Sequence, residues 1–444
     1  MRKRPIAVDL FAGVGGLSLG FEQAGFDVRT AVEIDPIHAA CHAYNFPECV
    51  VLPNSVSHLN GANIRENGGL GDEIIDVVCG GAPCQGFSII GKRAIDDPRN
   101  ALVKDFIRLV CELKARAFVF ENVKGLTQGK HRKFLDELIT EFERAGYEIT
   151  NPIKVLNAAN FAVPQSRDRL FLIGVKKGEK LPIYPINATS NPNMKIETDF
   201  PSAPNVMDAI GDLPDAETFE KLKHNDSVET DKFGEPSEYA AELRCLTNSA
   251  WHFGHPRKWV PNVLTSSMRT EHTDISRRRF ESTTYGKVEP ISRLFKLDPA
   301  GISNTLRAGT DASRGAFTSP RPIHPIHARC ITVREMARLH GFPDWFRFHK
   351  TKWHGARQIG NAVPPPLAKA VATQVLYALG FVPEVSFKQQ DLGDEKLLHM
   401  DLTEASKYWD VANPIARRDR KSGYKKRKQI EIEAHSKQNS EKVN

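Results

Sequence analysis

The first 180 residues alternate between short apolar runs and amphipathic segments. The apolar runs have the length of buried strands, and the segments between them have the spacing of helices that bury one face. Strands that alternate with helices favour an α/β fold with a doubly wound, mostly parallel sheet and helices on both of its faces. We expect strands at 6–11, 28–34, 74–79, 117–120 and 169–175, and helices at 16–24, from 36 onward, 99–114 and 133–145.

Several of these helices carry boundary signals. Gly25 and Gly146 each follow the last apolar position of a helix, where a left-handed residue ends the hydrogen-bond ladder. Asp35 precedes Pro36, which is the order expected of a capping residue and the first helical position. The ends of these helices are therefore predicted to within a residue or two.

The pattern changes after Val175. Residues 180–321 are rich in Pro, Asn, Ser and Thr, with short apolar pieces and a basic cluster at 277–279, which predicts a smaller, irregular second domain. Regular structure returns with the capping box Thr332–Glu335 and a helix at 367–379. We expect a first domain at 1–178, a second domain at 179–325, a return segment that completes the first domain at 326–390, and a polar, basic tail at 391–444.

Charge says little about partners. The net charge is +7, from 61 Lys and Arg against 54 Asp and Glu, and residues 417–428 carry all of that excess. The rest of the chain is nearly neutral, so nucleic-acid binding has to be argued from motifs. No apolar run has the length of a membrane span or a signal peptide, and seven cysteines without paired spacing predict neither disulfides nor a zinc site. We expect a cytoplasmic protein.

A glycine-rich turn follows the first strand, in the sequence DLFAGVGG from Asp9 to Gly16. Glycines allow the backbone to approach a ligand closely, and Glu33 ends the next strand, where doubly wound folds place an acid for ribose hydroxyls. On these residues alone, three interpretations stay open: a tight turn without ligand, an NAD site, and an S-adenosylmethionine site. The NAD fingerprint would need a glycine at Ser18.

Three further motifs place reactive side chains at strand ends. Cys84 lies in GGAPCQGFS after the strand 74–79, Glu121 ends the strand 117–120, and Arg167 and Arg169 precede the last strand at alternating positions that would face one side. Each has an ordinary alternative: a buried loop cysteine, a helix cap, and arginines paired with surface carboxylates. A thiol, a carboxyl and two guanidiniums at one sheet edge favour a catalytic site.

Taken in order, these motifs resemble the DNA (cytosine-5)-methyltransferase family of prokaryotic type, and the resemblance covers nearly all of residues 5–380. The motifs are DLFAGVGG from Asp9, VEIDP from Val32, GGAPCQGFS from Gly80, FENVKG from Phe120, QSRDR from Gln165, ITVREMARLHGFPD from Ile331 and QIGNAVPPPLA from Gln358. Seven motifs in order are far more specific than any one of them.

The resemblance implies a class I S-adenosylmethionine methyltransferase fold, with a catalytic and cofactor-binding first domain and a target-recognition second domain. It implies that Cys84 is the nucleophile, that Glu121 addresses N3 and the amino group of cytosine, and that Arg167, with Arg169 close by, addresses O2. No metal is required. The residues that it assigns to S-adenosyl-L-methionine are Phe11, Gly13, Gly15, Gly16, Glu33, Ile34, Pro83 and Asn361.

The chain departs from the family pattern at two places: Ser55 stands where an acid usually faces the adenine amino group, and Ala162 stands where a glycine is common, a change expected to matter little. The implied partner is double-stranded DNA, from which the target cytosine is flipped out. A cognate restriction endonuclease, a monomeric state and a place in the nucleoid are further expectations. The alternatives are a tRNA cytosine-5 methyltransferase, a catalytically silent DNA-binding homologue and an NAD oxidoreductase.

Overall fold

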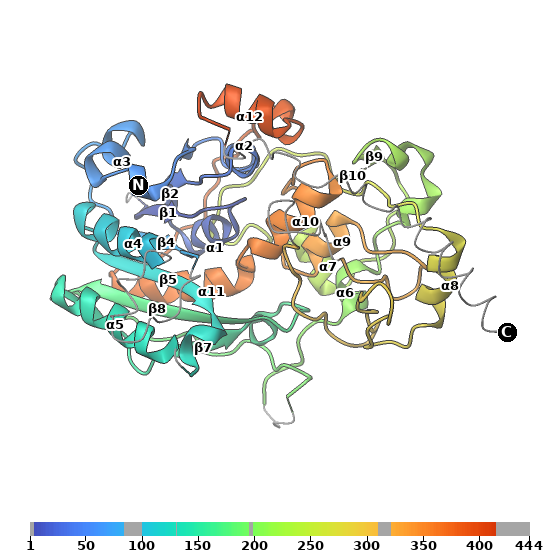
Figure 1. The fold of residues 1–444 in the computed structure, drawn as a ribbon, viewed down its shortest axis with the longest axis horizontal. Helices are drawn as coiled ribbons and strands as arrows, with labels where there is room; N and C mark the ends of the chain where they lie inside the picture. The colour runs from blue at the N-terminus through green and yellow to red at the C-terminus, as the bar shows by residue number, and fades with distance from the viewer. Residues whose placement is uncertain (1–3, 84–99, 130, 195–198, 310–320, 414–444) are drawn as a thin grey trace, which may run out of the picture.

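The computed structural model describes residues 4–83, 100–129, 131–194, 199–309 and 321–413. Among these residues, eight strands form one sheet in the order β3-β2-β1-β4-β5-β8-β6, with β7 paired to β8 (Figure 1). Neighbours from β3 to β5 are parallel, whereas β8 is antiparallel to β5, β6 and β7. The strands are β1 Ile6–Leu10, β2 Asp27–Val32, β3 Val50–Leu52, β4 Val77–Gly80, β5 Ala117–Val123, β6 Tyr147–Ile149, β7 Lys154–Asn157 and β8 Asp168–Lys176. The predicted mixed α/β fold with a largely parallel sheet is confirmed.

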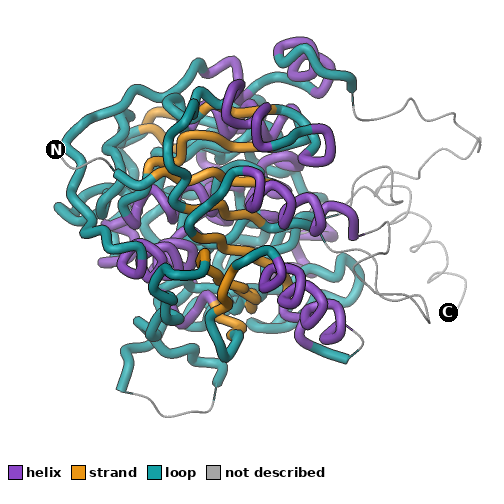
Figure 2. Tube along the Cα trace, turned by 90° about the vertical axis from the view of Figure 1, so that its left-hand side faces the viewer, coloured by secondary structure: helices purple, strands orange, loops and turns teal. Residues whose placement is uncertain are grey.

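Both faces of the sheet are buried, because successive strand residues belong to two different core clusters. Ala7 and Val119 lie in one cluster with the apolar faces of α1, α2 and α11, and Val8 and Phe120 lie in the other with those of α3, α4 and α5. Figure 2 shows the strands as a central layer with helices on either side. These helices are α1 Gly16–Ala24, α2 Pro36–Asn45, α3 Gly61–Asn67, α4 Ala101–Glu112, α5 His131–Arg144 and α11 Pro365–Ala378.

The helix boundaries follow the local signals. The side chain of Asp35 accepts hydrogen bonds from the first amides of α2, and Pro36 is its first residue. Gly25 has φ 113° after α1, and Gly146 has φ 89° after α5. Thr332 and Glu335 form the expected reciprocal capping box of α9 Val333–Arg338. The sequence signals therefore locate these ends correctly.

Residues 179–325, called the second region below, contain short elements wherever the structure describes them (right-hand half of Figure 1). Within this region, residues 253–257 lie against α1. There the guanidinium of Arg257 donates to both carboxylate oxygens of the buried Glu22 at 2.7 and 3.0 Å. The region's helices and strands are α6 Val206–Ile210, β9 Val228–Glu229, α7 Glu238–Leu243, β10 Val263–Leu264 and α8 Asp274–Ser282. The chain continues through α9, α10 Lys352–Asn361 and α11 to α12 Leu402–Tyr408.

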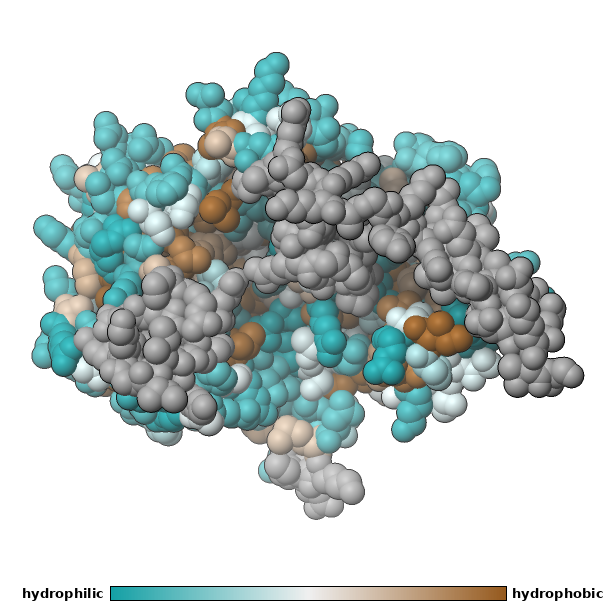
Figure 3. Space-filling model, in the orientation of Figure 1, coloured by the Kyte–Doolittle hydropathy of each residue, from teal (hydrophilic) through white to brown (hydrophobic). Residues whose placement is uncertain are grey.

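The visible surface is mainly polar. Where Figure 3 leaves described residues visible, hydrophilic residues predominate and hydrophobic ones are scattered. Among the helices that the structure describes, none combines the length and apolarity needed to cross a membrane.

The packing of α11 along α1 depends on Gly20. A Cβ atom at Gly20 would lie 2.4 Å from Cβ of Ala368 and 2.6 Å from the backbone nitrogen of Lys369. We expect Gly20→Ala to lower the free energy of unfolding by about 1–3 kcal/mol, the usual cost of overpacking, although alanine is the better helix former.

Chemical denaturation measures this change. Gly125→Ala is the matched control, because a Cβ there would meet a single side-chain atom at 4.0 Å. Equal stability of the two variants would contradict the expectation.

Candidate active site

The glycine-rich turn after β1 has a backbone that few side chains tolerate. Phe11, Gly13 and Gly15 have φ angles of 62°, 56° and 105°. The turn is held from β2, because the amide of Gly13 donates to Oε2 of Glu33 at 2.7 Å. A Cβ added to Gly13 would meet no atom within 4 Å, so one side of the turn is open. A ligand can therefore contact this backbone directly.

Glu33 lies at the centre of the turn's support. Its Oε1 accepts from the amide of Asp35 at 2.8 Å, so the carboxylate joins the turn to the start of α2. Burial raises the pKa of Glu33, and its hydrogen bonds to the two amides partly offset that shift. The next residue, Ile34, is 58% exposed. A carboxylate and an exposed apolar side chain thus lie beside the turn, as a nucleoside would require.

Asp9 and Ser18 form a buried pair that the sequence pattern does not predict. The hydroxyl of Ser18 donates to Oδ2 of the fully buried Asp9 at 2.6 Å. Burial raises the pKa of Asp9 to about 7. This bond explains why a serine occupies the position that an NAD fingerprint gives to glycine.

The return segment closes the other side of the turn. A Cβ on Gly16 would lie 2.4 Å from the backbone oxygen of Val363, which follows α10. Asn361, the last residue of α10, is exposed. The loop from Asn361 to Val363 therefore lies against the glycine-rich turn, although the two segments are more than 340 residues apart.

A second group of residues lies where β4 and β5 end. Nε of Arg169 is 2.7 Å from Oε1 of Glu121, and both side chains are about nine-tenths buried, at 13% and 12% exposure. Burial raises the pKa of Glu121, and the positive charge of Arg169 partly offsets that shift. The result is a sheltered carboxyl that holds a proton more readily than a free one.

The loop that carries the predicted nucleophile starts beside this pair. A Cβ on Gly81 would lie 2.6 Å from Oε2 of Glu121, and the amide of the Asn122 side chain donates to the backbone oxygen of Ala82 at 3.0 Å. Pro83 is exposed. Cys84 lies outside the described residues, one position beyond Pro83, so its side chain is not placed.

Arg167 makes a different set of hydrogen bonds from Arg169. Its guanidinium is buried and donates to the backbone oxygens of Leu306 at 2.8 Å, Gly360 at 2.8 Å and Ala362 at 3.0 Å. Arg167 therefore joins β8 to the second region and to the return segment, and Arg169 is the arginine paired with Glu121.

Gln165 and His340 lie in two of the motifs, but their contact with each other was not predicted. The Gln165 side chain lies 2.8 Å from Nδ1 of His340 and accepts from the amide of Leu306 at 3.1 Å. Nε2 of His340 lies 3.0 Å from the backbone oxygen of Ala362. Like Arg167, Gln165 and His340 therefore join the chain before β8 to the second region and to the return segment.

The two departures from the family pattern have local structural consequences. The hydroxyl of Ser55 accepts from the amide of Ser57 at 3.3 Å and so caps a short 3-10 helix. Ala162 has φ 57°, a left-handed conformation that favours glycine, and its amide donates to Thr189 at 2.9 Å. Alanine at this position is therefore in a strained backbone conformation, and the hydrogen bond to Thr189 stabilises that conformation.

Comparison with known proteins extends over most of the chain. A family model for C-5 cytosine-specific DNA methylases matches residues 6–377. The Type II methyltransferase M.XorII of Xanthomonas oryzae pv. oryzae is 54% identical over 418 residues, which cover 94% of this chain and 95% of that one. M1.HphI of Haemophilus parahaemolyticus, also a Type II methyltransferase, is 33% identical over 377 residues, covering 83% of this chain and 86% of the relative.

Solved structures agree. A prophage-encoded Escherichia coli protein, assigned as a DNA modification methyltransferase, superposes with a TM-score of 0.66 at 36% identity, covering 84% of this chain and 99% of that one. The Dnmt2 methyltransferase of Schizosaccharomyces pombe shares the fold, with a TM-score of 0.51 at 18% identity over 85% of this chain and all of that one. The chain belongs to the C-5 cytosine-specific DNA methylase family, and the protein is a DNA (cytosine-5-)-methyltransferase.

Proposed function

We propose that this enzyme transfers a methyl group from S-adenosyl-L-methionine to C5 of a cytosine flipped out of a specific DNA duplex, through a covalent bond between Cys84 and C6. The observation that carries the proposal is the buried Glu121–Arg169 pair, which lies against Gly81 at the start of the Cys84 loop. A carboxyl and a guanidinium at this place can hold the edge of a cytosine ring while a thiol approaches its face.

The covalent step makes C5 of cytosine reactive enough to accept a methyl group. C5 of cytosine is a poor nucleophile, and addition of the Cys84 thiolate to C6 forms a C6–S bond and turns C5 into an enamine carbon. After C5 has gained its methyl group, a base removes the C5 proton, the C5–C6 double bond re-forms, and the thiolate leaves. Sulfur is therefore unchanged at the end of each turnover.

Glu121 and Arg167 stabilise the charge that thiolate addition places on the ring. A Glu121 carboxyl with a raised pKa can donate or share a proton at N3, and its other oxygen can accept from the amino group. We assign O2 to Arg167, whose Nη atoms hold three backbone oxygens while its buried Nε has no hydrogen-bond partner among the described residues, and we assign to Arg169 the support of Glu121.

The residues around the glycine-rich turn fit S-adenosyl-L-methionine. The open side of Gly13 admits a ligand to the backbone, Glu33 can accept from ribose hydroxyls, and the exposed Ile34 can cover an adenine face. We assign Phe11, Gly15, Gly16, Pro83 and Asn361 to the same site. The cofactor, when bound, supplies an activated methyl group on a sulfonium centre.

Replacing Glu33 with alanine is expected to weaken S-adenosyl-L-methionine binding by about 1–3 kcal/mol, or roughly 5–150-fold in Kd. The change removes a charged acceptor and releases the amides of Gly13 and Asp35. Isothermal titration calorimetry measures the affinity. Glu33→Gln, which keeps one acceptor oxygen, should lose less, and an unchanged Kd for Glu33→Ala would remove Glu33 from the cofactor site.

We assign target recognition to the second region and double-stranded DNA as the substrate. The Type II methyltransferases among the relatives further suggest a restriction endonuclease that shares the recognised site. We expect a monomer that works on nucleoid DNA in the cytoplasm.

Methylation sequencing of host DNA and of tRNA after expression tests the substrate. We expect 5-methylcytosine within one DNA sequence, and none of it with a Cys84→Ser enzyme. Methylation confined to tRNA would favour the tRNA enzyme, and no methylation of either nucleic acid would favour a silent homologue.

A further inference from the structure

Residues 286–296 of the second region form a closed hairpin. The amide of Gly286 donates to the oxygen of Lys296 at 2.9 Å, and the amide of Lys296 donates to the oxygen of Lys287 at 2.8 Å. Nearer the tip, the backbone amide of Glu289 donates to the backbone oxygen of Leu294 at 2.8 Å. This ladder gives the segment the shape of a short two-stranded ribbon.

The tip of the ribbon is built around a buried carboxylate. Glu289 is 2% exposed and accepts from the amides of Ile291 at 3.1 Å and Ser292 at 2.5 Å. The amide of Arg293 donates to the backbone oxygen of Glu289 at 2.9 Å. Arg293 has φ 61°, a strained conformation for a residue with a side chain, and such strain gathers at functional positions. The tip is therefore preorganised.

The outer surface of this ribbon is suited to bases. Val288 and Ile291 are 48% and 63% exposed, and Lys287 and Arg293 are exposed cations. No carboxylate among the described residues pairs with Lys287 or Arg293. In contrast, Arg277 on the neighbouring α8 forms an ion pair with Glu217. The unpaired cations are thus available to a polyanion.

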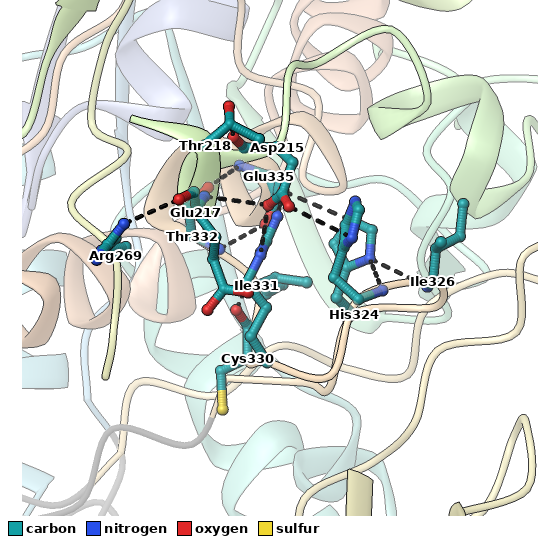
Figure 4. Close-up of polar contacts among 12 residues, drawn as sticks. Asp215, Glu217, Thr218, Arg269, His324, Ile326, Cys330, Ile331, Thr332 and Glu335 are labelled. Atoms are coloured by element: carbon teal, nitrogen blue, oxygen red, sulfur yellow. Dashed lines mark hydrogen bonds and ion pairs between the residues drawn. The ribbon is translucent and has the colours of Figure 1, made fainter. Parts of the chain in front are cut away.

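The base of the ribbon rests on a rigid platform. Phe295 accepts from the amide of Ile323 at 2.8 Å, and Leu297 donates to the oxygen of Ile323 at 3.1 Å. Beyond Ile323, Arg329 donates to both oxygens of the buried Glu335 at 2.8 and 2.9 Å. Figure 4 shows this cluster, with His324 beside Glu335 and Asp215 close by.

The chain that follows the ribbon, residues 297–306, runs to the residues just before β8. The amide of Ser166 donates to the oxygen of Ser303 at 2.8 Å, and the hydroxyl of Thr305 donates to the oxygen of Ser166 at 2.7 Å. Arg167 then holds Leu306. Nine residues lie between Lys296 and Leu306, so these two residues are at most about 36 Å apart.

We infer that residues 286–296 enter the major groove of the substrate duplex and that Arg293 recognises a guanine of the target sequence. This inference rests on the proposed function. The major groove is wide enough for a two-stranded ribbon, and an arginine fork donates to both O6 and N7 of guanine. Ile291 and Val288 lie against neighbouring bases, where they can contact thymine methyl groups.

The test compares initial methylation rates on the recognised duplex and on duplexes with one base pair changed. We expect Arg293→Ala to lose about 10–100-fold of discrimination at one G·C position and to keep discrimination at the others. Arg278→Ala is the matched control, because Arg278 is an exposed arginine on α8 outside the ribbon. We expect it to change the rate equally on all duplexes.

Two further variants separate charge, geometry and folding. Arg293→Lys keeps the charge without the fork and should lose most of the discrimination, whereas Arg293→Gly removes the side chain and relieves the strained backbone, so its unfolding midpoint should not fall. Unchanged discrimination in Arg293→Ala, or an equal loss of rate on every duplex, would overturn the inference. A wild-type enzyme that methylates no DNA would instead overturn the proposed function.

Discussion

Replacing Cys84 with serine is expected to lower methyl transfer on the order of 10⁴-fold or more, with cofactor and DNA binding largely retained. A serine hydroxyl has too high a pKa to supply an anion for addition to C6, and in the proposed mechanism the thiolate acts only in the chemical step. Transfer of a radiolabelled methyl group measures the loss, and calorimetry and gel shift measure binding.

Cys111→Ser is the control for this substitution, because Cys111 on α4 is a partly exposed cysteine outside the site. Its activity should match that of the wild type. Appreciable turnover by the Cys84→Ser enzyme would end the assignment of the nucleophile.

The same mechanism predicts a covalent trap. Duplex DNA with 5-fluorocytosine at the target should form an adduct that requires S-adenosyl-L-methionine and survives denaturation, because fluorine on C5 cannot leave as a cation and elimination stalls. Mass spectrometry should locate the cross-link in the peptide that contains Pro83, Cys84 and Gln85. If an active enzyme gives no shifted band, the covalent mechanism is excluded. A cross-link at another cysteine would show that this other cysteine is the nucleophile.

Glu121→Gln is expected to reduce kcat by about 10²–10⁴-fold. Glutamine keeps the size of the side chain and an acceptor for Arg169, but it cannot share a proton with N3. Since burial raises the pKa of Glu121, its acid form persists to higher pH than that of a free carboxyl, and the rate supported by that form falls as pH rises through the raised pKa.

A profile of kcat against pH measures this fall in rate at high pH, which should be missing in the Glu121→Gln enzyme. Glu148→Gln, a change to an exposed carboxylate on β6, is the control and should leave both kcat and the profile unchanged. A Glu121→Gln enzyme within tenfold of wild type would remove proton sharing from the mechanism.

Sequence patterns predicted the parts of the fold that depend on neighbouring residues. The cap at Asp35, the helix end at Gly25 and the capping box at Thr332 are local interactions, and each is present as expected. Strands β3, β6 and β7 were missed because each has only three or four residues, too few to show a period. The antiparallel direction of β8 was not predicted either, because direction depends on how the preceding chain crosses the sheet.

The site was predictable as a set of residues but not as a set of contacts. Alternation in QSRDR suggested that Arg167 and Arg169 share a side. Their roles separate because the oxygens that Arg167 binds belong to Leu306, Gly360 and Ala362, which lie 139 to 195 positions away in the chain. No local pattern contains such distant partners. The Asp9–Ser18 bond is closer in sequence, but only burial of Asp9 reveals its importance.

The packing of α11 on α1 also sets when a newly made chain becomes active. The 340 residues between Ala24 and Pro365 take a ribosome roughly 17–70 s to synthesise. Until residues 360–363, just before α11, emerge, the glycine-rich turn lacks the backbone of Val363 against Gly16, and Arg167 lacks two of its three oxygens. A nascent chain that already carries Cys84, Glu121 and the glycine-rich turn is thus still incomplete. Chains truncated by premature termination before this helix should be inert rather than unselective.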